Sequence, residues 1–141
     1  MLRSSRFDIA HLTERLQGAT RWVDDRPDVG DLSRGYFGAS TGAAAALRAA
    51  ADPDVDVDAI VSRGGRVDLA EAVADRVRAP SLFVVGGEDT DVLRMNEETI
   101  AEMTCHTELA VVEGAGHLFE GEGELDEVAD LAADWFVEHL R

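Results

Sequence analysis

The sequence contains no lysine, and its positive charge comes from 13 arginines alone. A phosphate-binding P-loop needs a lysine after its glycines, so this class of nucleotide-binding protein is excluded. Cys105 is the single cysteine, which rules out an internal disulfide framework. No apolar run approaches the roughly 20 residues of a membrane-spanning helix. The amino-terminal MLRSSRFDIAHL also lacks the apolar stretch of a signal peptide, so we expect a cytoplasmic protein.

Acidic residues outnumber basic ones by 29 to 13 in the 141 residues, which gives a formal net charge of −16 at pH 7. Such a chain repels nucleic acids and anionic membranes, so we expect neither as a partner. The acids are interspersed with apolar residues, as on the solvated faces of folded helices. Arginine in place of lysine on an acidic surface favours a halophilic protein, because at 1 M salt the Debye length is about 3 Å and self-repulsion is screened. An ordinary acidic cytosolic protein is the alternative.

Helical and extended segments alternate along the chain. Apolar spacing and short apolar runs predict a helix within residues 7–25, a strand at 34–38, a helix from Gly42, a strand at 57–62, a helix at about 68–77, a strand at 81–85, a helix at about 91–103, a strand at 108–112 and a helix at 125–140. This order predicts a three-layer α/β/α fold with a mainly parallel sheet of about four strands, covered on both faces by right-handed crossovers. We find no internal repeat and no domain boundary, so residues 1–141 are expected to form one domain.

The segment Gly38-Ala39-Ser40-Thr41-Gly42 matches the motif G-x-S-x-G, with a predicted strand before it and a predicted helix after it. In this motif the serine occupies a strained turn that projects its hydroxyl above the sheet. We expect glycines at both ends because side chains two residues from the serine would collide. The N–H of Thr41 lies at the positive end of the following helix, where it can donate to an oxyanion. The motif predicts Ser40 as a nucleophile, and a tight turn without chemistry is the alternative.

A serine nucleophile needs a general base and an acid that orients the base, and in this fold they follow the serine in the order acid, histidine. Asp89 comes just after the third predicted strand and His117 just after the fourth. Both are therefore expected at the carboxyl edge of the sheet that carries Ser40. Asp89 could instead cap the following helix, and Glu88 and Asp91 compete with it for the role of the acid.

The remaining histidines are weaker candidates for the base. His11 and His139 belong to predicted helices, whereas His117 lies in a glycine-rich loop after an apolar strand. His106 beside Cys105 offers two metal ligands, which are too few for a site, so we expect neither a metal nor an organic cofactor.

Two arginines flank Gly64-Gly65 at the carboxyl end of the second predicted strand. Arg63 and Arg66 would overlook the same crevice as the predicted nucleophile. A guanidinium there can bind a carboxylate or phosphate of a substrate. Surface pairing with the abundant acids is an equal alternative.

Five segments carry a resemblance to a known family: GYFGASTGAAAAL, VSRGGRVDLA, FVVGGEDTDVLRMN, GAGHLFE and LAADWFVEHL. Together they resemble the dienelactone-hydrolase-like branch of the α/β-hydrolases, most of all hydrolase domains sometimes fused to a phosphoribosyltransferase domain. The resemblance covers the chain from Phe7 onward. It implies a serine hydrolase of small esters or lactones, with Ser40, Asp89 and His117 at the triad positions and Thr41 as an oxyanion donor.

The sequence departs from that family at its beginning. Family members carry earlier strands and, with them, a loop that supplies the second oxyanion donor, commonly after a His-Gly motif. Removing one such donor costs about 10²–10³ in rate in a comparable enzyme. The resemblance therefore implies a partial fold, the C-terminal half of an α/β-hydrolase, in which the strand Arg34–Gly38 becomes an open edge of the sheet.

Two expectations follow from this departure. Across the open edge, the chain is expected either to form a homo-oligomer or to pair with a missing amino-terminal half. The leading hypothesis for its function is a serine hydrolase, and the alternative is a catalytically impaired, truncated hydrolase that serves as an interaction or assembly module. A binder of small ligands through Arg63 and Arg66 is a weaker third hypothesis.

Overall fold

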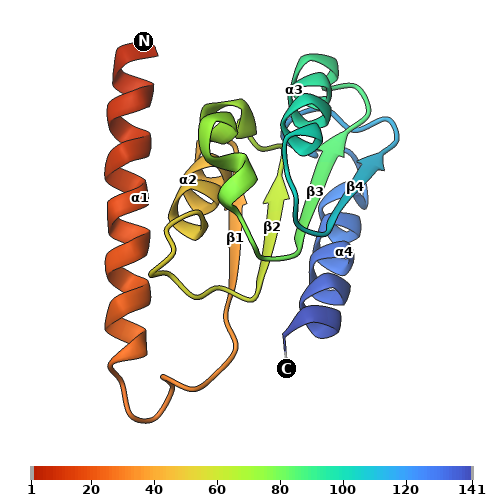
Figure 1. Ribbon diagram of the computed structural model, residues 1–141. Helices are drawn as coiled ribbons and strands as arrows, with labels where there is room; N and C mark the ends of the chain where they lie inside the picture. Colours follow the sequence, from red (N-terminus) through yellow and green to blue (C-terminus); the bar gives the residue numbers. More distant parts are fainter. Residues whose placement is uncertain (1, 141) are drawn as a thin grey trace.

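The computed structural model describes residues 2–140, with side chains for residues 8–140. Its elements in chain order are α1 (Leu2–Asp24), β1 (Gly35–Ala39), α2 (Thr41–Ala50), β2 (Ala59–Arg63), the 3₁₀ helix η1 (Val67–Arg76), β3 (Ser81–Gly86), α3 (Thr90–Ala101), β4 (Thr107–Val112) and α4 (Glu124–His139). The four strands are parallel and lie in the order β1-β2-β3-β4, with their carboxyl ends at one edge (Figure 1). The predicted α/β class is confirmed.

The boundaries of the elements differ from the prediction by a few residues. β1 and β2 begin and end later than predicted, so Ala39 and Arg63 are paired last residues of neighbouring strands. Arg63 therefore belongs to the sheet rather than to the following turn. The helix predicted at 68–77 is a 3₁₀ helix, the tighter form that often serves as a connector. None of the helices within residues 2–140 is both long enough and apolar enough to cross a membrane.

The two faces of the sheet are covered unequally. α2, η1 and α3 lie on one face, with α1 packed along α2, whereas α4 packs on the opposite face (Figure 1). Each new strand is added on the same side of the previous one, so right-handed connections place every crossover on the same face. The expectation that crossovers cover both faces is therefore wrong in this detail.

Side chains of the strands alternate between two cores, one on each face. On the crossover face the strands bury Tyr36, Ile60 and Phe83, and on the α4 face they bury Ala59, Val61, Leu82 and Val84. The small residues 43–46 of α2 are all at most 3% exposed, which lets this helix approach the sheet closely. Close packing of α2 holds the turn between β1 and α2 in place.

β1 lies at the end of the sheet, with β2 as its one neighbouring strand among the described residues. On the α4 face of β1, the Phe37 side chain is 52% exposed. α4 contacts β1 at Gly35, where the Phe136 ring occupies the space that a Cβ would need. In the described residues, β1 thus has an open edge and a half-covered aromatic side chain beside it.

Candidate active site

Ser40 lies in the tight turn between β1 and α2. Its φ of 50° and ψ of −122° place a non-glycine residue in the left-handed region, which costs on the order of 1–3 kcal/mol. The turn is held by hydrogen bonds from Ser40 N to Arg63 O (3.2 Å) and from Ala43 N to Ser40 O (3.2 Å). The strained turn expected from the sequence is present, and it sets Ser40 at the carboxyl edge of the sheet.

The two glycines of the motif have different surroundings. A Cβ on Gly38 would lie 2.6 Å from Gly42 O and 2.7 Å from the Ala43 Cα, so a side chain there collides with backbone. A Cβ on Gly42 would meet nothing within 4 Å among the described residues. The expectation that both positions lack room is right for Gly38 and wrong for Gly42, because the turn folds back over the first glycine alone.

The three predicted side chains of the site lie in hydrogen-bond contact. Ser40 Oγ is 2.8 Å from His117 Nε2, and His117 Nδ1 is 2.8 Å from Asp89 Oδ2. The His117 side chain is 38% exposed and that of Asp89 is 15% exposed. Of the competing acids, Glu88 and Asp91 are exposed, and the contact with the imidazole is made by Asp89.

Backbone contacts bring the loops of the acid and the histidine together. Glu88 N donates to Ala115 O at 2.9 Å, one hydrogen bond between the loop of Asp89 and the loop of His117. Gly86 ends β3 where a Cβ would collide with the carbonyl oxygen of Ala115. A glycine at this position therefore lets the two loops approach closely enough for the imidazole to meet the carboxylate.

A turn after β2 also contacts the imidazole, and it contains Gly64, for which the sequence analysis predicted no role beyond spacing two arginines. Gly64 has a φ of +54°, and a Cβ on it would lie 3.3 Å from Cε1 and from Nδ1 of His117. The imidazole thus packs against backbone. The glycine pair 64–65 at the end of a predicted strand was the available sequence signal for such a close approach.

Thr41 is the first residue of α2 and follows Ser40 directly. Its amide N–H has no acceptor within the helix, and it stands at the positive end of the helix dipole. An amide in this place can donate to negative charge that develops beside the Ser40 side chain.

The two arginines flagged by the sequence have different partners. Arg66 donates from Nε and Nη2 to the two carboxylate oxygens of Asp68, both at 3.1 Å, and this bonding raises the pKa of Arg66. Arg63 has no carboxylate within ion-pair distance among the described side chains, and its Cζ lies 6.0 Å from the centre of the Phe119 ring. The pairing alternative thus describes Arg66, whereas Arg63 makes no ion pair with a described side chain.

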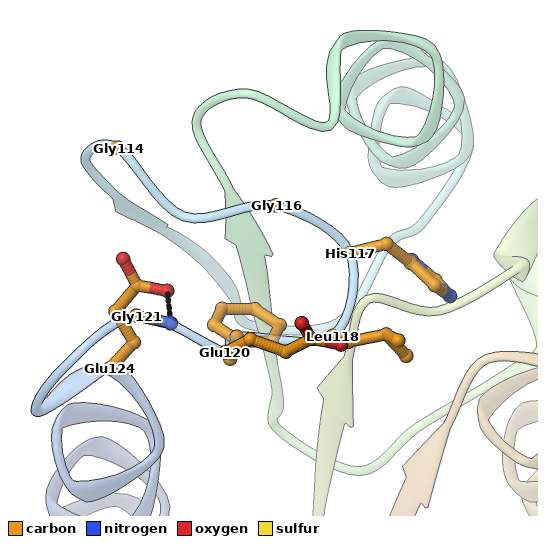
Figure 2. A pocket seen from close by; sticks show the side chains of 8 residues that line it. Gly114, Gly116, His117, Leu118, Glu120, Gly121 and Glu124 are labelled. Carbon is orange, nitrogen blue, oxygen red and sulfur yellow. Dashed lines mark hydrogen bonds between the residues drawn. The ribbon is translucent and has the colours of Figure 1, made fainter.

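A hollow of about 490 Å³ lies behind the histidine, lined by residues 114, 116–121 and 124 (Figure 2). In this view the His117 ring points away from Gly121 and Glu124, whose backbone N–H and Oε1 are hydrogen-bonded at 2.9 Å. Phe119 of the same loop lines the hollow and is also the aromatic ring over which the Arg63 guanidinium lies.

His106 and Cys105 contact other parts of the molecule than the residues described above. The His106 ring stacks on Trp135 with ring centres 5.5 Å apart, and burial raises the pKa of the Cys105 thiol. Within the part of the chain that the structure describes, no three His, Cys, Asp or Glu residues are grouped so that they could hold a metal ion.

Comparison with known proteins identifies the family of the chain. The sequence pattern of the dienelactone hydrolase family matches residues 2–138. The chain belongs to the dienelactone hydrolase family. A solved dienelactone hydrolase from Anabaena variabilis is 49% identical, with a TM-score of 0.92 over 96% of this chain and 62% of that one.

Two Mycobacterium tuberculosis proteins, each named as a candidate phosphoribosyl transferase, are 53% identical over 138 residues, which is 98% of this chain and 31% of theirs. Their names fit the resemblance to family domains that accompany a phosphoribosyltransferase. A serine hydrolase homologue from Coxiella burnetii is 24% identical with a TM-score of 0.72 over 86% of this chain and 57% of that one, which is a likeness of fold. This family member therefore spans about a third of its curated relatives and less than two thirds of the Anabaena enzyme.

Proposed function

We propose that this chain carries the nucleophile, the base and the orienting acid of a serine hydrolase for small esters or lactones. The observation that carries the proposal is the continuous pair of 2.8 Å hydrogen bonds from Ser40 through His117 to Asp89, with Ser40 on a strained turn. A general base must lie within about 2.6–3.2 Å of the proton that it takes, and His117 meets this requirement without any rearrangement.

The reaction divides between these residues as follows. Ser40 Oγ forms a bond to the carbonyl carbon of the substrate while its proton passes to Nε2 of His117. Asp89 accepts from Nδ1 and stabilises the imidazolium that results. The Thr41 N–H donates to the oxyanion. Collapse of the tetrahedral intermediate expels the alkoxide, which takes the proton from His117, and water then releases the acyl group from Ser40 by the same steps.

Labelling with a fluorophosphonate tests the proposal directly, because this reagent phosphonylates an activated serine. In 2 M KCl the chain should be labelled at Ser40, as read by peptide mass spectrometry. Ser40→Ala and His117→Ala should abolish labelling. His11→Ala, which replaces a histidine of α1, should leave it unchanged. A folded wild-type chain that stays unlabelled would contradict the proposal.

A finer part of the proposal concerns the substrate. Arg63 makes no ion pair with a described side chain, in a chain with 29 acidic residues, and it directly precedes Gly64, whose backbone packs against His117. A guanidinium in such a position binds a carboxylate or phosphate group with charge-assisted hydrogen bonds. The proposed substrate is therefore an anionic ester or lactone. Arg66 would first have to release Asp68 before it could take this role.

The open edge of β1 supports a second proposal, that strands from outside the described residues pair with Gly35–Ala39. An exposed strand edge beside an exposed aromatic residue favours association. The partner is either a second copy or the remainder of a longer polypeptide such as the relatives have. If the chain is instead a catalytically impaired interaction module, it would bind its partner through the same edge. Light scattering in 2 M KCl tests this: a homogeneous monomer with no bound partner would count against it.

The charge distribution supports a third proposal, that the protein works at high salt. A net charge of −16 on 141 residues produces self-repulsion that salt screens. The melting temperature should therefore rise as KCl is raised from 0.1 to 2 M. A melting temperature that is flat or falling over this range would contradict the proposal. The cytoplasmic location expected from the sequence stays a prediction.

A further inference from the structure

Asn96 of α3 is a fully buried polar residue that the proposed reaction does not use. Its side chain is 0% exposed, and Nδ2 donates to Gly65 O at 3.0 Å and to Val92 O at 2.8 Å. Its Oδ1 has no partner among the described residues. Burying an amide oxygen without a hydrogen bond costs about 1–3 kcal/mol. An apolar residue of similar size would avoid this cost, so packing alone does not account for an asparagine here.

The segment that Asn96 bonds is the turn of residues 63–66, and this turn contacts both the nucleophile and the base. Ser40 N donates to Arg63 O at 3.2 Å, and Arg66 N donates to Ser40 O at 3.0 Å. Between these bonds, the Gly64 backbone packs against the His117 imidazole, since a Cβ there would lie 3.3 Å from Nδ1. A shift of the turn would therefore change the position of Ser40 and of His117 together.

The turn is held from several sides. Gly64 N donates to Val84 O of β3 at 2.7 Å, which fixes it to the sheet. At Gly65 a Cβ would collide with Ser62 Oγ of β2 and with the Ala43 side chain of α2, so this residue has no room to move toward either element. The carbonyl of Gly65 points to α3, where Asn96 donates to it. The amide of Asn96 thus links α3 to the turn.

We infer that Asn96 is a positioning residue, which holds the 63–66 turn through Gly65 and so sets where His117 Nε2 stands relative to Ser40 Oγ. This inference rests on the proposed hydrolase function. It also explains the residue type, because Asn96 must donate to two carbonyl groups at once. An ionised aspartate has no donor and would place a carboxylate oxygen next to the Gly65 and Val92 carbonyl oxygens. Leucine could not donate to either of them.

The test compares Asn96→Leu with Thr99→Val. Thr99 lies one turn later on α3, is also 0% exposed, and has an Oγ1 without a partner among the described residues. It therefore matches Asn96 in burial and in having a buried oxygen without a partner, and no hydrogen bond joins its side chain to the turn. Both variants are assayed for hydrolysis of an aryl ester in 2 M KCl, with rates corrected for the folded fraction.

Asn96→Leu should lower kcat about 10- to 100-fold with KM changed less than about twofold, since small displacements of reacting groups have effects of this size. Thr99→Val should leave kcat within about twofold of wild type, whatever it does to stability. A folded Asn96→Leu variant with wild-type kcat and pH profile would overturn the inference, because Asn96 would then be a packing residue alone.

A second readout separates this inference from the proposed function. In ¹⁵N NMR spectra, the His117 ring resonances should shift in Asn96→Leu and stay in place in Thr99→Val, even if the wild-type chain has no esterase activity. Unshifted ring resonances in Asn96→Leu would overturn the inference with or without activity. If Asn96→Leu does not fold, Asn96→Ala, which removes the same donor with a smaller side chain, should shift the same resonances; their constancy there would overturn the inference equally.

Discussion

The two sides of Ser40 differ. Toward β2, β3 and β4, hydrogen bonds join the loops at the carboxyl ends of the strands. On the other side, β1 has no neighbouring strand within the described residues. The first side brings His117 and Asp89 into contact with Ser40 through two 2.8 Å hydrogen bonds. The second side leaves Phe37 52% exposed. The groups that activate the proposed nucleophile are thus contained in the chain, while the surroundings of β1 are open.

This contrast separates two parts of hydrolase chemistry. Activation of a serine depends on the base and its acid, which loops after β3 and β4 supply. Stabilisation of the oxyanion depends on donors beside the serine, of which the described residues offer Thr41 N–H. Since one donor is worth about 10²–10³ in rate, the proposed chemistry should be present and slow unless the β1 side is completed.

The largest expected effect comes from breaking the bonded side. Ser40→Ala and His117→Ala should each lower kcat for an aryl ester about 10⁴- to 10⁶-fold, limited by the background rate. The double variant should be no slower than either one, because the two residues act as a unit. Additive losses, measured by initial rates in 2 M KCl, would mean that the two residues work separately.

The two sides should also differ in what an aromatic residue contributes to stability. Phe83→Ala removes a side chain that is 0% exposed and should lower the free energy of unfolding by about 3–5 kcal/mol. Phe37→Ala on β1 should lower it by less than about 1.5 kcal/mol in a monomeric chain, because the ring is only half buried. Urea unfolding at high salt measures both. An equal loss at the two positions would show that Phe37 is covered in solution.

A smaller effect distinguishes the two glycines of the elbow. Gly38→Ala should lower the free energy of unfolding by about 1–3 kcal/mol, because its Cβ meets backbone atoms that cannot move away. Gly42→Ala should raise it by about 0.5–1 kcal/mol, because alanine favours the helix and the space is open. A loss at Gly42 comparable with that at Gly38 would mean that something other than the described residues occupies the space beside Gly42.

The smallest expected effect concerns the substrate. Arg63→Gln should lower kcat/KM for an anionic ester about 10-fold relative to a neutral ester of the same size, which corresponds to about 1.4 kcal/mol. Arg66→Gln should change that ratio less than about twofold, because Asp68 already takes the guanidinium. The ratio is measured by initial rates with the paired esters. Equal effects of the two variants would contradict the proposal that Arg63, and not Arg66, binds the anionic group.

Much of the fold could be predicted because its signals are local. Apolar runs bounded by glycine and proline marked four strands, and helical spacing marked the segments between them. Strand boundaries differed by one or two residues, since pairing with the neighbouring strand decides where a strand ends. The placement of the crossovers was wrong because it depends on the order of the strands in the sheet, and no local pattern encodes that order.

The site was predicted less completely. Ser40, Asp89 and His117 stood out by motif and by position after strands, and the structure brings them together. Gly64 carried a weak signal, and Asn96 carried none, because a buried asparagine on a helix looks like any polar residue of an amphipathic pattern. Its partner, a backbone carbonyl of another loop, leaves no trace in the sequence.

The sequence by itself determined the class of the fold, the strained turn at Ser40 and the excess of acidic charge, since each depends on residues close together in the chain or on composition. Tertiary structure decided which of three acids meets His117 and which of two arginines, Arg63 or Arg66, pairs with a carboxylate among the described residues. Ser40 and His117 lie 77 residues apart. Their distance in space depends on strand order and on close backbone contacts between loops, which are properties of the folded sheet.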